Sequence, residues 1–259
     1  MTEILIVTLF SLALGSFGNN VISYFISHNG FDLNRSTCLC GEKKLKVIEL
    51  IPVLSFLFQK GKCTLCTKRI PIRYLFVELC SLILGLLIIY NYGFSLLALI
   101  SFLIFYVLLL ISVIDFYKYI IPNKLTSVLI ILVTTYLIVN SENILERSIL
   151  SGLILFTFLV IQYLFERLKR KEAIGAGDIK LIFVLSLLLE TPDSLIAIWL
   201  SSMIALIMVT ASKLFYDKNI RHEKVPFGLF LSIGFFIVFI LNIKYELTGL
   251  QHIAELIWQ

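Results

Sequence analysis

Charged residues are scarce in this sequence: Asp, Glu, Lys and Arg make up only 15% of its 259 residues, whereas 59% are hydrophobic. An ordinary soluble domain is about half apolar and about a quarter charged, so this excess is more than one soluble core needs. The sequence also has no internal repeat and no low-complexity linker. Because the apolar residues come in long runs, the composition indicates a membrane protein.

Other familiar signals are also missing. The three histidines, His28, His222 and His252, are scattered and show no metal-site spacing. The segment Gly175-Ala176-Gly177 is not a nucleotide-binding loop, since no strand precedes it and neither a third glycine nor Gly-Lys-Ser/Thr follows. No methyl-donor motif is recognisable.

Eight apolar runs predict an all-α, polytopic membrane bundle of about eight transmembrane helices. The runs are continuous rather than alternating, and a helix satisfies its own backbone hydrogen bonds in lipid. They cover about 3–26, 74–92, 94–114, 125–140, 147–165, 179–190, 193–213 and 226–243. The first run begins with Glu3 and is followed by no convincing cleavage site, so we expect a retained span rather than a signal peptide.

The basic residues predict the orientation of these spans. Loops 27–73, 115–124, 166–180 and 214–225, together with Lys213, contain 20 of the 22 Lys and Arg residues. Because positive loops stay inside, these loops are predicted to be cytoplasmic and both termini external. The same bias explains the net charge of +5 without nucleic acid as a partner.

The predicted organisation has three parts. Residues 1–26 form the first transmembrane helix, 27–73 a large cytoplasmic loop and 74–259 a transmembrane core. Within the loop, Val47–Phe58 is apolar but too short to span, and is expected at the interface or against helix ends.

Two aspartates are the candidate catalytic residues. Asp115 follows the run ending in LLLISVI, and Asp178 follows Gly175-Ala176-Gly177 and opens the sixth span. Both are therefore predicted at similar depth on the cytoplasmic side, where ionisable groups are costly and so candidates for function. The alternative is that each is an interfacial charge or a helix cap.

A carboxyl pair can support acid–base catalysis. Like charges a few ångströms apart do not both ionise cheaply, so the pair shares a proton and titrates as a unit. The flanking Gly175 and Gly177 let backbone pass close to another helix or to a substrate. Lys180 either stabilises a carboxylate, reaches a lipid phosphate or simply extends to the interface.

Several motifs, in order along the chain, resemble those of type IV prepilin peptidases. Gly175 to Leu181 (GAGDIKL) is similar to their GxGD motif, and Asp115-Phe116 with Ile121-Pro122-Asn123 is similar to the segment of their first catalytic aspartate. Further matches are Gly15-Ser16-Phe17, Asn19, Glu49-Leu50-Ile51-Pro52, Arg73, Glu78-Leu79 and Pro226-Phe227-Gly228.

This resemblance implies an activity. Family members are membrane aspartyl endopeptidases that remove a short basic leader from type IV prepilins, or from pseudopilins of secretion and DNA-uptake (competence) machines, on the cytoplasmic side. Asp115 and Asp178 would be catalytic, with Gly175, Gly177, Lys180, Pro226, Phe227 and Gly228 in support. Many members also methylate the new N-terminus with S-adenosylmethionine. The implied location is the inner or plasma membrane, in contact with lipid.

The cysteines of the large loop suggest a metal site. Cys38, Cys40, Cys63 and Cys66 form two pairs, and paired thiolates suit tetrahedral zinc, which would hold a loop too small for its own core. Disulfides are less expected in a reducing cytoplasm. The first pair, Cys38-Leu39-Cys40, is one residue shorter than the Cys-x-x-Cys of the family. Four reduced thiols in a loop held by other contacts are the alternative.

Three other functions remain open. A related GxGD protease would act on another substrate, such as a preflagellin of the archaeal type. An ion-coupled transporter would use the aspartates for proton or cation coupling, and is expected to carry charges near the bilayer centre and broken repeat helices. A non-enzymatic assembly factor would tolerate loss of either aspartate.

Overall fold

The structure of this protein is a computed structural model that describes residues 2–27, 51–64, 66–140, 143–169, 175–216 and 225–247. The chain divides into two compact units, Met1–Tyr90 and Asn91–Gln259. All the regular elements in the described ranges are helices, apart from an isolated β-bridge between Lys62 and Arg69.

The first unit contains α1 (Thr2–Ser27), the short α2 (Leu54–Phe58) and most of α3 (Arg73–Tyr92). Helices α1 and α3 pack closely, because Ser81 Oγ donates a hydrogen bond of 2.7 Å to the Ser11 carbonyl oxygen. A Cβ atom at Gly15 would lie 2.8 Å from the Glu78 Cα, so only glycine allows this approach. Small residues therefore determine the packing of these two apolar helices.

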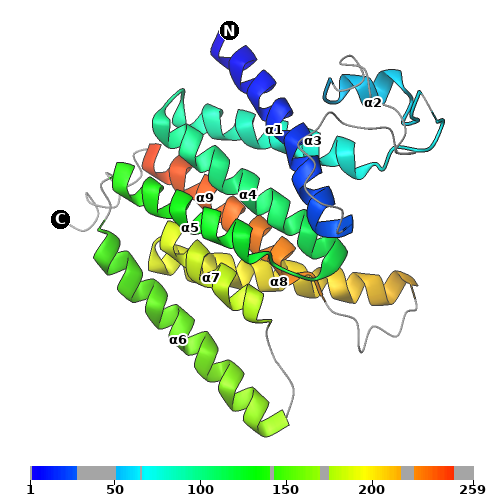
Figure 1. Cartoon of the computed structure of the whole chain (residues 1–259). Helices are drawn as coiled ribbons and strands as arrows, with labels where there is room; N and C mark the ends of the chain where they lie inside the picture. The colour runs from blue at the N-terminus through cyan, green and yellow to red at the C-terminus, as the bar shows by residue number, and fades with distance from the viewer. Residues whose placement is uncertain are drawn as a thin grey trace. The chain divides into compact units, whose positions relative to one another are not determined.

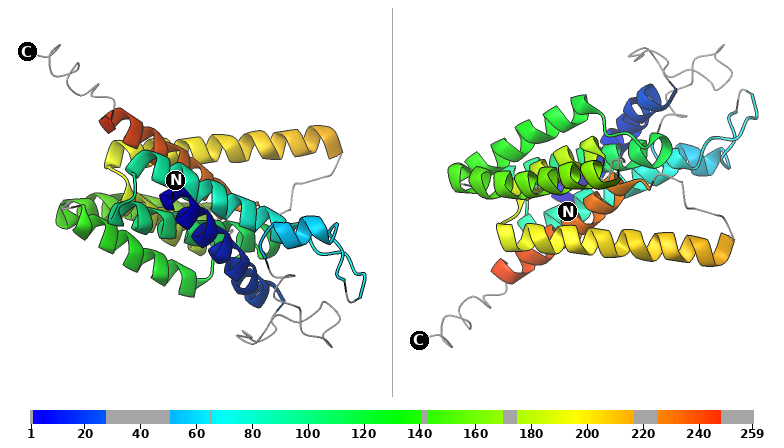
Figure 2. Two further views of the ribbon diagram at one scale, coloured as in Figure 1. Left: turned by 90° about the horizontal axis from the view of Figure 1, so that it is seen from above. Right: turned by 90° about the horizontal axis from the view of Figure 1, so that it is seen from below.

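The second unit contains six helices, whose bounds are α4 (Leu96–Lys118), α5 (Asn123–Val139), α6 (Ile144–Lys169), α7 (Ala176–Leu188), α8 (Thr191–Tyr216) and α9 (Phe227–Leu247). Helix α4 is the most buried candidate span and packs against α5 and α9. Helix α7 packs on α5, α6 and α9, and α8 lies against α9 (Figures 1 and 2).

The helices agree with the predicted membrane bundle, and each of the eight predicted runs coincides with one of them. Among the described residues, α1, α3, α4, α6 and α8 are long and apolar enough to cross a membrane, while α5 and the part 227–242 of α9 are shorter apolar helices. The 13 residues of α7 rise only about 20 Å. The protein is thus an all-α, multi-pass membrane protein.

The end of α4 differs from the sequence prediction. The third run was expected to end at residue 114, before Asp115, but α4 continues to Lys118. It ends there because Tyr119 adopts a left-handed conformation (φ 56°) and its N–H donates to the Asp115 carbonyl oxygen. Asp115 therefore lies inside the last turn of α4, and residues 119–122 connect α4 to α5.

The contact between α8 and α9 yields a first testable expectation. A Cβ atom at Gly234 would collide with Ser201 Oγ and would lie 2.8 Å from the Ala197 carbonyl oxygen. We expect Gly234→Ala to lower the free energy of unfolding by about 1–3 kcal/mol through overpacking, measured as a lower Tm in detergent. Adding Ser201→Ala should recover only part of the loss, since the Ala197 carbonyl is backbone. An unchanged Tm in Gly234→Ala would contradict this packing.

Candidate active site

Asp115 is buried, with 4% of its surface exposed, and its carboxylate faces the beginning of α9. The backbone N–H groups of Gly228 and Leu229 donate hydrogen bonds to it. These are first-turn donors that have no partner within their own helix, so the N-terminus of α9 is a favourable place for a carboxylate. The Oδ2 atom of Asp115 has no hydrogen-bond partner among the described residues. One oxygen of the carboxylate thus remains available for a proton or a water molecule.

Asp178 lies in the first turn of α7, whose N-cap is Gly175. Its half-buried carboxylate turns back over the cap, because a Cβ atom at Gly175 would lie 2.9 Å from Asp178 Oδ2. The first glycine of the motif therefore leaves room for the carboxylate itself. The positive end of the α7 dipole also favours an anion at this position.

Ile121, in the connector between α4 and α5, links the two aspartate-bearing regions. A Cβ atom at Gly177 would lie 3.1 Å from Ile121 Cβ, and one at Gly228 would lie 3.2 Å from Ile121 Cδ1 and 3.0 Å from Asp115 Oδ2. Both glycines thus bring the starts of α7 and α9 against the same side chain. The charge of Asp115 acts electrostatically on Asp178.

The remaining supporting residues lie around this point. Lys180 is exposed, and its Nζ donates a hydrogen bond of 3.3 Å to Asn123 Oδ1 at the start of α5. Pro226 and Phe227 are half-buried and lead into Gly228 at the start of α9. The sequence identified Ile121 only as part of a motif. Its contacts with Gly177 and Gly228 are long-range, and no local sequence pattern indicates them.

Motif residues of the first unit also come together. The buried Glu78 carboxylate accepts a hydrogen bond of 2.7 Å from the Val53 N–H and another from Ser16. The Asn19 amide donates to the Tyr74 carbonyl oxygen at 3.0 Å. These bonds join α1, α3 and the segment before α2.

The candidate metal ligands are only partly described. Cys38 and Cys40 lie outside the described residues, as do Glu49 and Leu50. Cys63 is buried and Cys66 half-buried, on a tight turn in which the Thr67 N–H donates to the Cys63 carbonyl oxygen and the Cys63 N–H to that of Lys68, each at 2.9 Å. Such a turn suits two thiolates of a zinc site. Within the described ranges no group of three or more His, Cys, Asp or Glu residues is arranged to hold a metal.

Fold and site together define a class: a multi-pass helical membrane protein with a pair of interacting aspartates where helix ends meet. Comparison with known families agrees with this class. Residues 9–92 match the bacterial peptidase A24 N-terminal domain, and residues 102–210 match the type IV leader peptidase family. No solved structure matches this chain significantly.

Curated relatives cover most of the chain. The prepilin leader peptidase/N-methyltransferase of Vibrio cholerae is 32% identical over 250 residues, which are 91% of this chain and 96% of the relative. Proteins with the same name from Bacillus subtilis and Dichelobacter nodosus are 27% and 30% identical, over 88% and 78% of this chain and 90% and 68% of theirs. This protein belongs to the type IV leader peptidase family.

Proposed function

We propose that this protein is an intramembrane aspartyl endopeptidase that removes the leader peptide of type IV prepilins or pseudopilins. The observation that carries the proposal is that two aspartates meet at helix ends: Asp115 is buried with one oxygen that has no described partner, and Asp178 lies at the start of α7. Ile121 brings the segments that carry them together. Neither carboxylate has a cationic partner among the described contacts that would hold it as a structural ion pair. The family membership supports the same reading.

The proposed mechanism uses the two carboxyls as one acid–base unit. The ionised member takes a proton from a water molecule, whose oxygen attacks the scissile carbonyl carbon. The protonated member donates its proton to the carbonyl oxygen. Collapse of the tetrahedral intermediate breaks the C–N bond: one hydroxyl of the intermediate returns its proton to the ionised member, and the protonated member gives its proton to the leaving amine. The pair then again holds one proton. Because the two groups titrate together, neither role belongs to one aspartate alone.

The proposed geometry of the substrate follows from the basic loops. With loops 27–73, 115–124, 166–180 and 214–225 in the cytoplasm of a bacterial cell, the aspartates lie at the cytoplasmic face of the inner membrane. A helical precursor would then present the boundary between its basic leader and its apolar helix at that depth. Reaction of cysteines introduced at residues 118 and 190 with an impermeant thiol reagent in intact cells tests this orientation: 190 should react and 118 should not.

N-methylation is the second part of the proposal. The relatives are named prepilin leader peptidase/N-methyltransferase, and a methyl group would come from S-adenosylmethionine. Mass spectrometry of the mature product, after incubation with and without S-adenosylmethionine, separates the two activities. A cleaved but unmethylated product would support the peptidase activity and refute the methyltransferase activity.

The test of the peptidase is cleavage of a pilin-like precursor by the purified protein in detergent. We expect one cut at the leader boundary, located by mass spectrometry of both fragments. Failure to cut a range of such precursors would refute the proposal. A proton-flux assay in liposomes would then test the alternative function, an ion-coupled transporter.

We also propose that the large loop binds zinc through Cys38, Cys40, Cys63 and Cys66. Replacing Cys63 with serine is expected to release the metal and lower the Tm of the protein, with a smaller loss of cleavage than an aspartate substitution causes. Metal content and Tm with and without a chelator provide the measurement. Cys80→Ser, in the middle of α3, is the matched control. Absence of metal with an unchanged Tm would rule the site out.

A further inference from the structure

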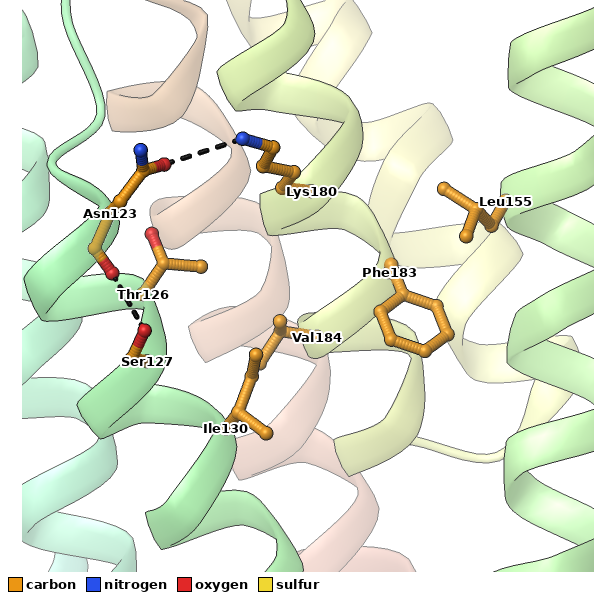
Figure 3. Close-up of a pocket in the computed structure, with 8 residues that line it drawn as sticks. All are labelled: Asn123, Thr126, Ser127, Ile130, Leu155, Lys180, Phe183 and Val184. Atoms are coloured by element: carbon orange, nitrogen blue, oxygen red, sulfur yellow. Dashed lines mark hydrogen bonds between the residues drawn. The ribbon is translucent and has the colours of Figure 1, made fainter.

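A groove of about 300 Å³ lies between α5 and α7, with Leu155 of α6 at its edge (Figure 3). Asn123, the first residue of α5, and Lys180, near the start of α7, form one end, where the Lys180 side chain reaches across to Asn123. Ile130 lies seven residues further along α5, which is about 10 Å deeper along the helix axis. The groove therefore runs from the helix starts towards the middle of α5 and α7.

The two ends of the groove differ in chemistry. Its outer end carries the Lys180 ammonium and the Asn123 amide, while the hydroxyl of Ser127 is already engaged with the Asn123 carbonyl oxygen. Its inner end is apolar, lined by Ile130, Phe183 and Val184. A suitable occupant is polar at one end and apolar beyond it, with no positive charge beside Lys180.

The polar end of the groove lies at the same end of α5 and α7 as the candidate active site. Asn123 follows Ile121 by two residues, and Lys180 follows Asp178 by two residues. Ile121 contacts both glycines of that site. The Lys180–Asn123 pair therefore joins the same two segments, the start of α7 and the start of α5 with its connector, that Gly177 and Ile121 bring together.

We propose that this groove binds the start of the apolar helix of the precursor, directly after the bond that is cut. The proposal rests on the peptidase function proposed above. Lys180 acts as a specificity-determining residue: its charge repels the basic leader, so the precursor lies with the leader outside and the apolar segment inside. A lipid could also fill an amphipathic groove, but the nearness of its polar end to the segments that carry the aspartates favours the precursor.

The chain offers a matched pair of variants for the test. Ile130 lines the groove, whereas the adjacent Ile131 is 62% exposed and does not line it. Ile130→Trp fills the groove, and we expect kcat/KM for a full precursor to fall roughly 10- to 100-fold, mainly through KM. A truncated precursor that ends soon after the cleavage site should be cut as by the wild type. Ile131→Trp should match the wild type on both substrates.

Photocrosslinking provides a second measurement that does not depend on a bulky substitution. A benzophenone amino acid at position 130, in the full-length protein with Asp178→Asn, should crosslink to the apolar part of the precursor, whereas one at position 131 should crosslink to lipid. Crosslinking to lipid alone from position 130, or normal cleavage of the full precursor by Ile130→Trp, would refute precursor binding in the groove. Neither result would contradict the proposed peptidase function. A wild-type protein that cuts neither substrate would overturn both proposals.

Discussion

Replacing either Asp115 or Asp178 with asparagine is expected to reduce cleavage of a pilin-like precursor by about a thousandfold or more, because proton transfer by a positioned carboxyl contributes about 10²–10⁴ to a rate. Asparagine has nearly the shape of aspartate but cannot ionise or pass a proton. At position 115 its amide oxygen still accepts from the N–H groups of Gly228 and Leu229, so the fold should survive. The measurement is single-turnover cleavage with Tm recorded beside it.

Asp193→Asn is the matched control for these two variants. Asp193 lies in the first turn of α8, separated from Asp178 by the length of α7, and its Oδ2 accepts a hydrogen bond of 2.6 Å from Asn242. The Asp193→Asn variant should cleave the precursor at the wild-type rate, because an asparagine oxygen accepts the same hydrogen bond. Full activity in either Asp115→Asn or Asp178→Asn would refute the carboxyl pair and favour the assembly factor. Loss of activity in all three variants would indicate a general effect of removing acidic groups.

The fold could be predicted from sequence because lipid limits the choices. An apolar run in a bilayer has to be a helix, so the eight runs coincide with helices to within a few residues. The prediction was least accurate at the polar ends, where composition stops being informative. Helix α4 continues through Asp115 to Lys118 because the end is set by the backbone conformation of Tyr119, which no hydropathy pattern indicates.

The candidate site was predictable in its residue types but not in its geometry. Two signals pointed to Asp115 and Asp178. The motifs around them occur in the order of the family, and a carboxylate at a membrane edge is unusual in itself. The contact of Asp115 with the start of α9 joins residues more than a hundred positions apart, and the sequence predicted Gly228 only as a supporting residue without a partner. Two other features likewise depend on how four chain segments meet: the contacts of Ile121 with two glycines and the Lys180–Asn123 hydrogen bond.

Replacing Gly228 with alanine is expected to reduce kcat roughly 10- to 100-fold while leaving the Tm nearly unchanged, since small displacements of catalytic groups have effects of this order. The new Cβ atom would lie 3.0 Å from Asp115 Oδ2 and 3.2 Å from Ile121 Cδ1, so it presses on the one carboxylate oxygen that has no described partner. Both neighbours are side-chain ends that can yield by a few tenths of an ångström. The carboxylate therefore moves and the helix does not.

Two further variants separate the two contacts. Gly152→Ala, at a position on α6 where a Cβ atom meets nothing within 4 Å, controls for the loss of a helical glycine and should stabilise the protein by about 0.5–1 kcal/mol without changing cleavage. Adding Ile121→Val to Gly228→Ala removes Cδ1 and relieves only the contact with Ile121. If displacement of Asp115 causes the loss, cleavage stays low in the double variant. Full recovery would instead make Ile121 the side chain whose position controls the pair.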